Sequence, residues 1–129
     1  NYQQVARQMD LVIQDIKLLD PAAHRYYTGV DNAMILHNVC WLVHSGIPFR
    51  IRVPLIPTVN DNPAMMEGIV HLLEGAHALE KVELLPYNTA AGAKYAGLSM
   101  DYQPQFPVSR KPNIPIEPFK EAGIPCDIL

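Results

Sequence analysis

Phe-Arg-Ile-Arg-Val-Pro-Leu-Ile-Pro, residues 49–57, is the stretch that decides the fold class. Arg50 and Arg52 lie two positions apart, so on a β-strand both side chains project from one face and the intervening apolar side chains project from the other. Pro54 and Pro57 cannot donate hydrogen bonds to a neighbouring strand, so strand pairing should weaken from Pro54 onward. The stretch therefore predicts a strand with one packed face and one working face, which ends at the mouth of a site.

Two further apolar runs predict strands, and helical patterns lie between them. The predicted strands cover residues 10–17 and 81–87, and the predicted helices cover residues 20–28, 31–45 and 62–78. Asp20 and Asn62 each precede a proline, a pattern that begins helices, and Gly29 and Gly46 are placed to end them. This order of elements predicts parallel strands joined by crossovers, the pattern of an α/β fold.

The composition limits the classes of function. The chain has 129 residues, 49% of them hydrophobic and 18% charged, and a formal net charge of -3, which is typical of one soluble globular domain. No dense Lys/Arg cluster indicates a nucleic-acid partner, and no apolar stretch approaches the roughly 20 residues that span a bilayer. The two cysteines, Cys40 and Cys126, form no C-x-x-C pattern, which favours a reducing, cytoplasmic location.

The two ends of the chain differ in character from its middle. The first residue is not methionine, so we expect this to be a piece of a longer protein. Residues 1–102 form the predicted β/α core, and residues 103–129 form a proline-rich tail. Within that tail, residues 119–122 could form a helical turn and residues 126–129 a short last strand.

Polar side chains gather where the predicted strands end. Asp15 and Lys17 end the first strand, Arg52 lies near the end of the second, and Asn88 follows the third. Ligands of parallel β/α folds bind at the carboxyl ends of the strands. An acid, an ammonium, a guanidinium and an amide together suit a zwitterionic or carboxylate-bearing small molecule.

Structural interpretations of these residues remain open at this point. Asp15 and Lys17 could form an ion pair that only caps the strand, and Arg50 could reach the surface without a ligand. His37 and His44 lie seven positions apart on one predicted helix face, where solvated or packed histidines are more common than metal ligands. No Gly-x-Gly-x-x-Gly indicates a dinucleotide site.

An ordered series of motifs resembles a known family. In chain order the motifs are Asp15-Ile16-Lys17, Asp20-Pro21 with His24, Thr28-Gly29-Val30-Asp31-Asn32, Ile35-Leu36 with Asn38, Arg52-x-Pro-Leu-Ile-Pro, Asn60-Asp61 and Val82-Glu83-Leu84-Leu85-Pro86-Tyr87. The series resembles the C-terminal half of the glycyl-radical-enzyme activating enzymes, radical S-adenosylmethionine proteins typified by pyruvate formate-lyase activating enzyme. The resemblance covers roughly residues 8–102.

The resemblance implies a fold and a reaction. The fold would be part of a partial TIM-type barrel of parallel β/α units. In the family, a 4Fe-4S cluster, reduced by a donor such as flavodoxin or ferredoxin, cleaves S-adenosylmethionine. The 5′-deoxyadenosyl radical that forms then abstracts a hydrogen atom from a glycine of a partner such as pyruvate formate-lyase. By position, Asp15, Lys17 and Arg52 would hold S-adenosylmethionine, Asp15 would also bind a monovalent cation, and Asn88 stands where some members have a cofactor-contacting histidine.

The chain departs from the family in one large respect. It lacks the C-x-x-x-C-x-x-C cluster motif, and Cys40 and Cys126 alone cannot replace it, so we expect the isolated chain to be inactive. An incomplete barrel would also expose the edge of its first strand, which favours self-association. Two other functions stay open, a β/α-barrel lyase that forms a Schiff base through Lys17 and a non-catalytic half-barrel that binds a partner or metabolite.

Overall fold

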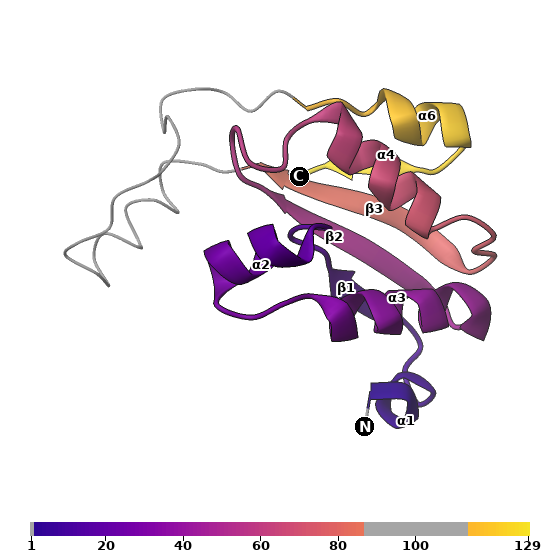
Figure 1. Cartoon of the computed structure of the whole chain (residues 1–129). Coiled ribbons are helices and arrows are strands. Elements are labelled where there is room, and N and C mark those ends of the chain that lie inside the picture. Colours follow the sequence, from indigo (N-terminus) through magenta and orange to yellow (C-terminus); the bar gives the residue numbers. More distant parts are fainter. Residues whose placement is uncertain (1, 87–113) are drawn as a thin grey trace.

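The fold is a four-stranded parallel sheet with helices between the strands (Figure 1). The computed structural model describes residues 2–86 and 114–129. The strand order is β1-β2-β3-β4, which follows the sequence, and this parallel α/β arrangement confirms the predicted fold class. The strands are β1 (Val12–Asp15), β2 (Phe49–Leu55), β3 (Leu79–Pro86) and β4 (Cys126–Ile128), and the helices are α1 (Tyr2–Ala6), α2 (Pro21–Thr28), α3 (Ala33–Ser45), α4 (Pro63–Leu72) and α6 (Glu117–Ala122).

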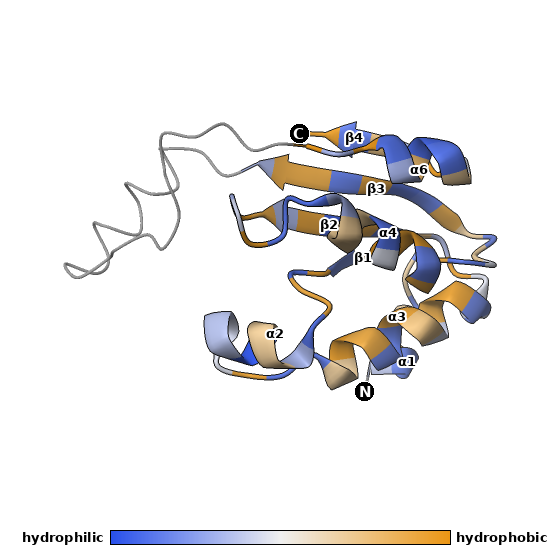
Figure 2. Cartoon of the chain, turned by 45° about the horizontal axis from the view of Figure 1, so that its top comes forward, coloured by the Kyte–Doolittle hydropathy of each residue, from blue (hydrophilic) through white to orange (hydrophobic). Residues whose placement is uncertain are grey.

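Strand β2 has the two faces that its sequence predicts. Phe49, Ile51, Val53 and Leu55 are buried, and the residues between them are half-buried. The buried face packs with side chains of α3, α4 and α6 into one core, to which Val39, Met66 and Phe119 contribute. The apolar stretches of β2 and β3 run through the middle of the molecule in Figure 2. The opposite face, which carries Arg50 and Arg52, is called the polar face below.

The helix boundaries rest on the predicted capping residues. The Asp20 carboxylate accepts a hydrogen bond from the Ala23 N–H at 2.8 Å, and the Asn62 side-chain oxygen accepts one from the Met65 N–H at 2.8 Å. Each cap is followed by a proline, which needs no partner for its nitrogen at the start of a helix. Gly29 ends α2 with a φ of 86°, in the left-handed region that glycine adopts without strain.

Two local predictions are wrong. The strand predicted over residues 10–17 covers only Val12–Asp15, and its apolar Ile13 is 45% exposed. The helix expected to reach residue 78 ends at Leu72, and Gly75 adopts a φ of 83° that no helix continues through. Glycine at position 68, within α4, leaves room for the Leu19 side chain, because a Cβ there would lie 2.5 Å from Cδ1 of Leu19.

The last described residues belong to the sheet. The expected helical turn and short last strand are confirmed as α6 and β4, and Phe119 of α6 is fully buried. Strand β4 pairs with β3 through Val82 opposite Cys126 and Glu83 opposite Asp127. The proposed boundary between residues 102 and 103 lies outside the described residues and stays a prediction. No helix in the described part of the chain is long and apolar enough to cross a membrane.

Candidate ligand-binding site

A row of charged residues crosses the polar face. Asp15 on β1 is in register with Arg52 on β2, Arg52 with Glu83 on β3, and Glu83 with Asp127 on β4. Parallel strands lie about 4.8 Å apart, so side chains that share a register position are neighbours. The sheet therefore brings Asp15 and Arg52 together, as the sequence predicts, and adds two acidic residues to them.

Asp15 and Lys17 offer charged groups that have no side-chain partner in the described part of the chain. Both residues are exposed, and within residues 2–86 and 114–129 neither side chain takes part in a hydrogen bond or an ion pair. The interpretation of Asp15 and Lys17 as a structural ion pair is therefore not supported. The two residues lie two positions apart at the end of an extended segment, where a carboxylate and an ammonium are available to a ligand.

Arg52 is held by a carboxylate. Its Nε donates to Oε1 of Glu83 at 3.0 Å, and the Arg52 side chain remains 37% exposed. Arg50 makes a similar contact nearer the start of the strand, with Nε 2.8 Å from Oε1 of Glu80. Both arginines therefore combine a carboxylate partner with partial exposure, and Arg52 lies closer to the carboxyl end of β2.

The loop after β2 fastens the ends of β1 and β2 to each other. Asn60 is fully buried, and its amide nitrogen donates to the carbonyl oxygens of Lys17 at 2.7 Å and of Pro54 at 2.8 Å. Its side-chain oxygen accepts from the Ile56 N–H at 2.7 Å. Asn60 therefore fixes the backbone that carries Lys17 relative to the strand that carries Arg52.

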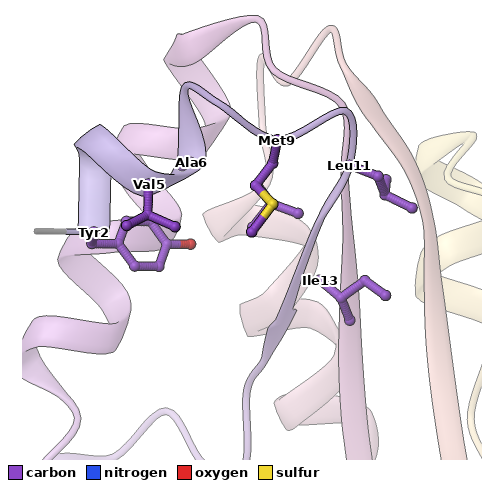
Figure 3. A pocket seen from close by; sticks show the side chains of 7 residues that line it. Tyr2, Val5, Ala6, Met9, Leu11 and Ile13 are labelled. Carbon is purple, nitrogen blue, oxygen red and sulfur yellow. The ribbon is translucent and has the colours of Figure 1, made fainter.

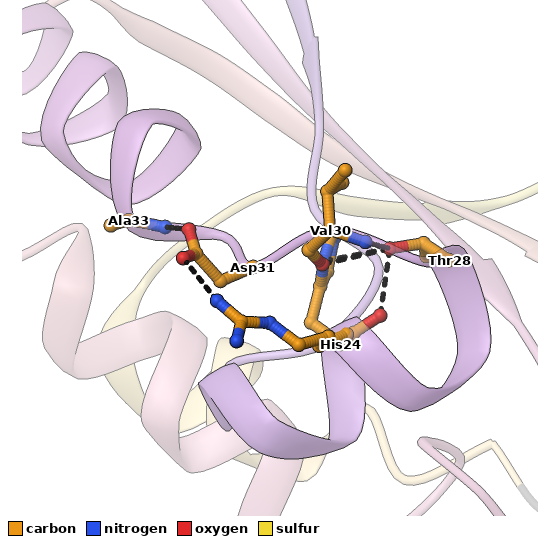
Figure 4. Close-up of polar contacts among 6 residues, drawn as sticks. His24, Thr28, Val30, Asp31 and Ala33 are labelled. Carbon is orange, nitrogen blue, oxygen red and sulfur yellow. Dashed lines mark hydrogen bonds and ion pairs between the residues drawn. The ribbon is translucent and has the colours of Figure 1, made fainter.

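Polar contacts among its own residues hold the loop between α2 and α3 (Figure 4). Nδ1 of the buried His24 lies 2.7 Å from the carbonyl oxygen of Val30, so this nitrogen carries the proton. Thr28 donates through Oγ1 to the His24 carbonyl at 2.7 Å. Two hydrogen bonds to the Asp31 carboxylate lower its pKa below the usual value. The one from the Ala33 N–H has the larger effect, and the one from Arg25 the smaller. These contacts give a structural reason for the motif at residues 24–32.

Asn32 connects that loop to the segment that follows β1. Its side-chain nitrogen donates to the carbonyl oxygens of Leu18 at 2.8 Å and Leu19 at 2.9 Å, and the residue is buried. Asn60 and Asn32 thus bind three consecutive backbone carbonyls, those of Lys17, Leu18 and Leu19. The sequence marks both residues as motif positions but does not show what they bind.

The described residues do not fit an iron–sulfur cluster. Cys40 lies on α3 and Cys126 on β4, and both thiols are free. The pKa of the Cys126 thiol is raised to about 11, mainly by burial and to a smaller extent by the charge of Asp127. This shift disfavours the thiolate form that binds metals. No group of three or more potential ligands is placed to hold a metal ion in the described segments. Asn88 lies outside the described residues.

A separate apolar pocket lies beside β1 (Figure 3). It measures about 430 Å³ and is lined by residues from α1 to β1, namely Tyr2, Val5, Ala6, Met9, Leu11, Val12 and Ile13. Burial raises the pKa of Tyr2, whose hydroxyl donates to Gln14 at 2.9 Å. The pocket offers apolar contact at the sheet edge and takes no part in the charged row.

Curated proteins similar to this chain share one kind of function. The chain is 36% identical over 100 residues to the choline trimethylamine-lyase activating enzyme of Oleidesulfovibrio alaskensis, a match over 75% of this chain and 32% of that protein. It is 36% identical to the trans-4-hydroxy-L-proline dehydratase activating enzyme of Clostridioides difficile and 30% identical to the pyruvate formate-lyase-activating enzyme of Clostridium pasteurianum. Each of these two matches covers 80% of this chain. This chain belongs to the glycyl-radical-enzyme activating enzymes.

A solved structure agrees with this family at the level of the fold. A domain of pyruvate-formate lyase-activating enzyme from Bacteroides vulgatus superposes with a TM-score of 0.73 at 24% identity, covering 99% of this chain and 72% of that chain. No family model matches the chain. The chain spans 32%, 34% and 43% of the three curated activating enzymes, so it represents less than half of their length.

The sequence did not identify Glu83 and Asp127 as part of the polar face. Glu83 is one residue of the Val82–Tyr87 motif, for which the sequence predicts no role at the site, and Asp127 lies in the segment that was expected to be a proline-rich tail. The sequence carries one signal for Glu83. On a predicted strand Glu83 lies two positions from Lys81, so both side chains project from one face, and the apolar Val82 and Leu84 project from the other. No comparable signal places Asp127, because the pairing of β4 with β3 joins residues far apart in sequence.

Proposed function

We propose that this chain is the cofactor-holding part of a radical S-adenosylmethionine activating enzyme. The observation that carries the proposal is the register of Asp15 with Arg52 in a chain of this family, together with the exposed Lys17, where neither Asp15 nor Lys17 has a side-chain partner among the described residues. The methionine end of S-adenosylmethionine bears a carboxylate and an ammonium. Arg52 and Lys17 suit the carboxylate, and Asp15 suits the ammonium or a monovalent cation. Asn88 is proposed as a further contact on the family resemblance alone.

The cluster and the partner complete the proposal. We infer that the 4Fe-4S cluster is bound by cysteines outside residues 1–129 and is reduced by a flavodoxin or a ferredoxin. In the intact enzyme the cluster would supply the electron for cleavage of S-adenosylmethionine, and residues 1–129 would contribute Asp15, Lys17 and Arg52 to hold the methionine end of that cofactor. The partner would be a glycyl radical enzyme, which would receive its radical on a glycine. Without the cluster, residues 1–129 alone would be inactive.

Two measurements test the proposal. Titration calorimetry with S-adenosylmethionine should show binding to the wild-type chain and a loss of about tenfold or more in affinity for Arg52→Ala and Lys17→Ala. Arg50→Ala is the matched control, because Arg50 lies on the same face and makes an equivalent contact with Glu80, but lies further from the carboxyl end of β2. Equal affinity in all variants would exclude these residues from the site.

The coding sequence upstream of residue 1 tests the cluster. A C-x-x-x-C-x-x-C motif there, in frame, is the expected result. A start codon directly before residue 1 would instead leave the natural protein without the family's cluster ligands, and a non-catalytic half-barrel would then be the better interpretation. The Schiff-base lyase has less support, since such a lysine is usually desolvated and Lys17 is exposed.

Self-association through the edge of β1 is the last part of the proposal. The edge strand and the exposed Val5, Met9 and Ile13 beside it support a contact with another sheet edge or apolar surface. Sedimentation of the isolated chain should detect dimers, and Ile13→Lys should abolish them by placing a charge at that edge. A monomer at all concentrations would contradict this part without affecting the binding site.

A further inference from the structure

Glu83 is a buried charge on the polar face. Its side chain is 5% exposed, and it lies on β3 between the fully buried Val82 and Leu84. A carboxylate removed from water is strongly destabilising unless cations compensate it. Two cations lie beside Glu83. Nε of Arg52 is 3.0 Å from its Oε1, and Nζ of Lys81 is 3.9 Å from its Oε2. Asp127 holds that Lys81 ammonium in turn, at 2.7 Å.

The contact with Arg52 uses the inner nitrogen of the guanidinium. Because Glu83 accepts from Nε, the two terminal amino groups of Arg52 are not occupied by this carboxylate, and no other described residue bonds to them. A guanidinium is planar, so one fixed N–H together with the side-chain stem determines where the terminal groups point. Those groups form the fork that binds carboxylates with two parallel hydrogen bonds.

We propose that Glu83 is a positioning residue, which fixes the guanidinium of Arg52 through Nε so that its terminal amino groups remain available to the carboxylate of the bound ligand. The identity of the ligand, S-adenosylmethionine, rests on the proposed function. The orientation of Arg52 by Glu83 does not. Glu83 also offsets part of the positive charge that Arg52 and Lys81 bring to the polar face, which keeps the region suited to a zwitterion rather than to a simple anion.

The polar face contains a matched control for this proposal. Arg50 donates through Nε to Oε1 of Glu80 at 2.8 Å, the same pair of atoms as in the Arg52–Glu83 contact. Glu80 is 44% exposed, whereas Glu83 is 5% exposed, and Arg50 lies further from the carboxyl end of β2. Glu80→Gln therefore removes an equivalent charge from the same face without altering Arg52.

The first experiment measures Arg52 directly. In NMR spectra of the wild-type chain, the Nε–H of Arg52 should exchange slowly with solvent, and in Glu83→Gln it should exchange about tenfold faster or more. Glu80→Gln should leave the Arg52 signal unchanged. An Arg52 Nε–H that exchanges at the same rate in the wild type and in Glu83→Gln would overturn the proposal.

The second experiment measures S-adenosylmethionine affinity in the same variants by calorimetry. Glu83→Gln should weaken binding about tenfold, whereas Glu80→Gln should not change it. Arg52→Lys keeps the charge but has no Nε–H, so adding Glu83→Gln to Arg52→Lys should weaken binding no further. Equal losses from Glu83→Gln and Glu80→Gln would contradict the positioning role. If the wild type itself does not bind S-adenosylmethionine, the proposed ligand fails, and the exchange rates still decide the role of Glu83.

Discussion

Asn60 donates a hydrogen bond from its side chain to the backbone carbonyl of Lys17 at 2.7 Å, which joins the loop after β2 to the end of β1. Two further hydrogen bonds of this buried side chain stay within its own loop and strand. Replacing Asn60 with alanine leaves three backbone groups unpaired, so we expect the free energy of unfolding to fall by roughly 2–4 kcal/mol. Urea unfolding followed by circular dichroism measures this change.

Asn62→Ala is the control for Asn60→Ala. Asn62 caps α4 with one strong hydrogen bond to the Met65 N–H, and loss of such a cap costs about 1 kcal/mol. The Asn60 variant should therefore be clearly the less stable of the two. Equal losses would show that the connection between β1 and β2 adds little beyond an ordinary cap.

Replacing Thr58 with glycine should stabilise the protein. Its φ of 65° lies in the left-handed region, which a β-branched residue adopts only under strain. Its backbone N–H donates to Oδ1 of Asp61 at 2.9 Å, a contact that glycine keeps. Thr58→Gly should raise the free energy of unfolding by about 0.5–1 kcal/mol, after allowance for the greater freedom of glycine in the unfolded chain.

The opposite substitution tests the same reasoning. Gly46 ends α3 with a φ of 76° and has open space where a Cβ would be. Gly46→Ala should therefore lower stability by about 1 kcal/mol through backbone strain alone. If thermal unfolding showed both substitutions to be neutral, the backbone at these positions would be less restricted than the structure indicates.

The two cysteines should differ in reactivity. Burial and the neighbouring Asp127 raise the pKa of Cys126 from 9.0 to about 11, while Cys40 lies exposed on α3. Near pH 8, the raised pKa leaves about a hundredfold less thiolate at Cys126 than in the unfolded chain, so iodoacetamide should label Cys40 first. Peptide mass spectrometry measures both rates, and in denaturant the two rates should converge.

The same shift predicts a direction for stability. The folded pKa of Cys126 is raised, so its stabilising contribution is fully present below pH 9 and is lost as the pH rises towards about 11. Cys126→Ser has no thiol to titrate in this range and should show a weaker decline in stability over that interval. An unchanged decline would assign it to other groups.

Phe119 tests whether the last described residues belong to the fold. The side chain is fully buried in the common core, so Phe119→Ala should lower the free energy of unfolding by roughly 3–5 kcal/mol. Glu121→Ala, at an exposed position of the same helix, should change it by less than about 0.5 kcal/mol. A small effect at Phe119 would mean that α6 opens independently of the sheet.

The sequence predicts features that depend on local patterns. The alternation along β2 assigns Arg52 to the polar face, and the caps at Asp20 and Asn62 follow from their own side chains. Features that depend on distant neighbours were not predictable. Ile13 is exposed because its register with Arg50 places it on the polar face, and Glu83 is buried because Arg52, Lys81 and β4 lie beside it.

The final position of β4 has a consequence during synthesis of the protein. Strand β3 is complete at Pro86, but its partner β4 begins only at Cys126. At ordinary translation rates the ribosome needs a few seconds to make the intervening residues. Until β4 has been made, the edge of β3 lacks the strand that covers it in the folded structure, so a pause in translation within this interval would prolong exposure to chaperones and to aggregation.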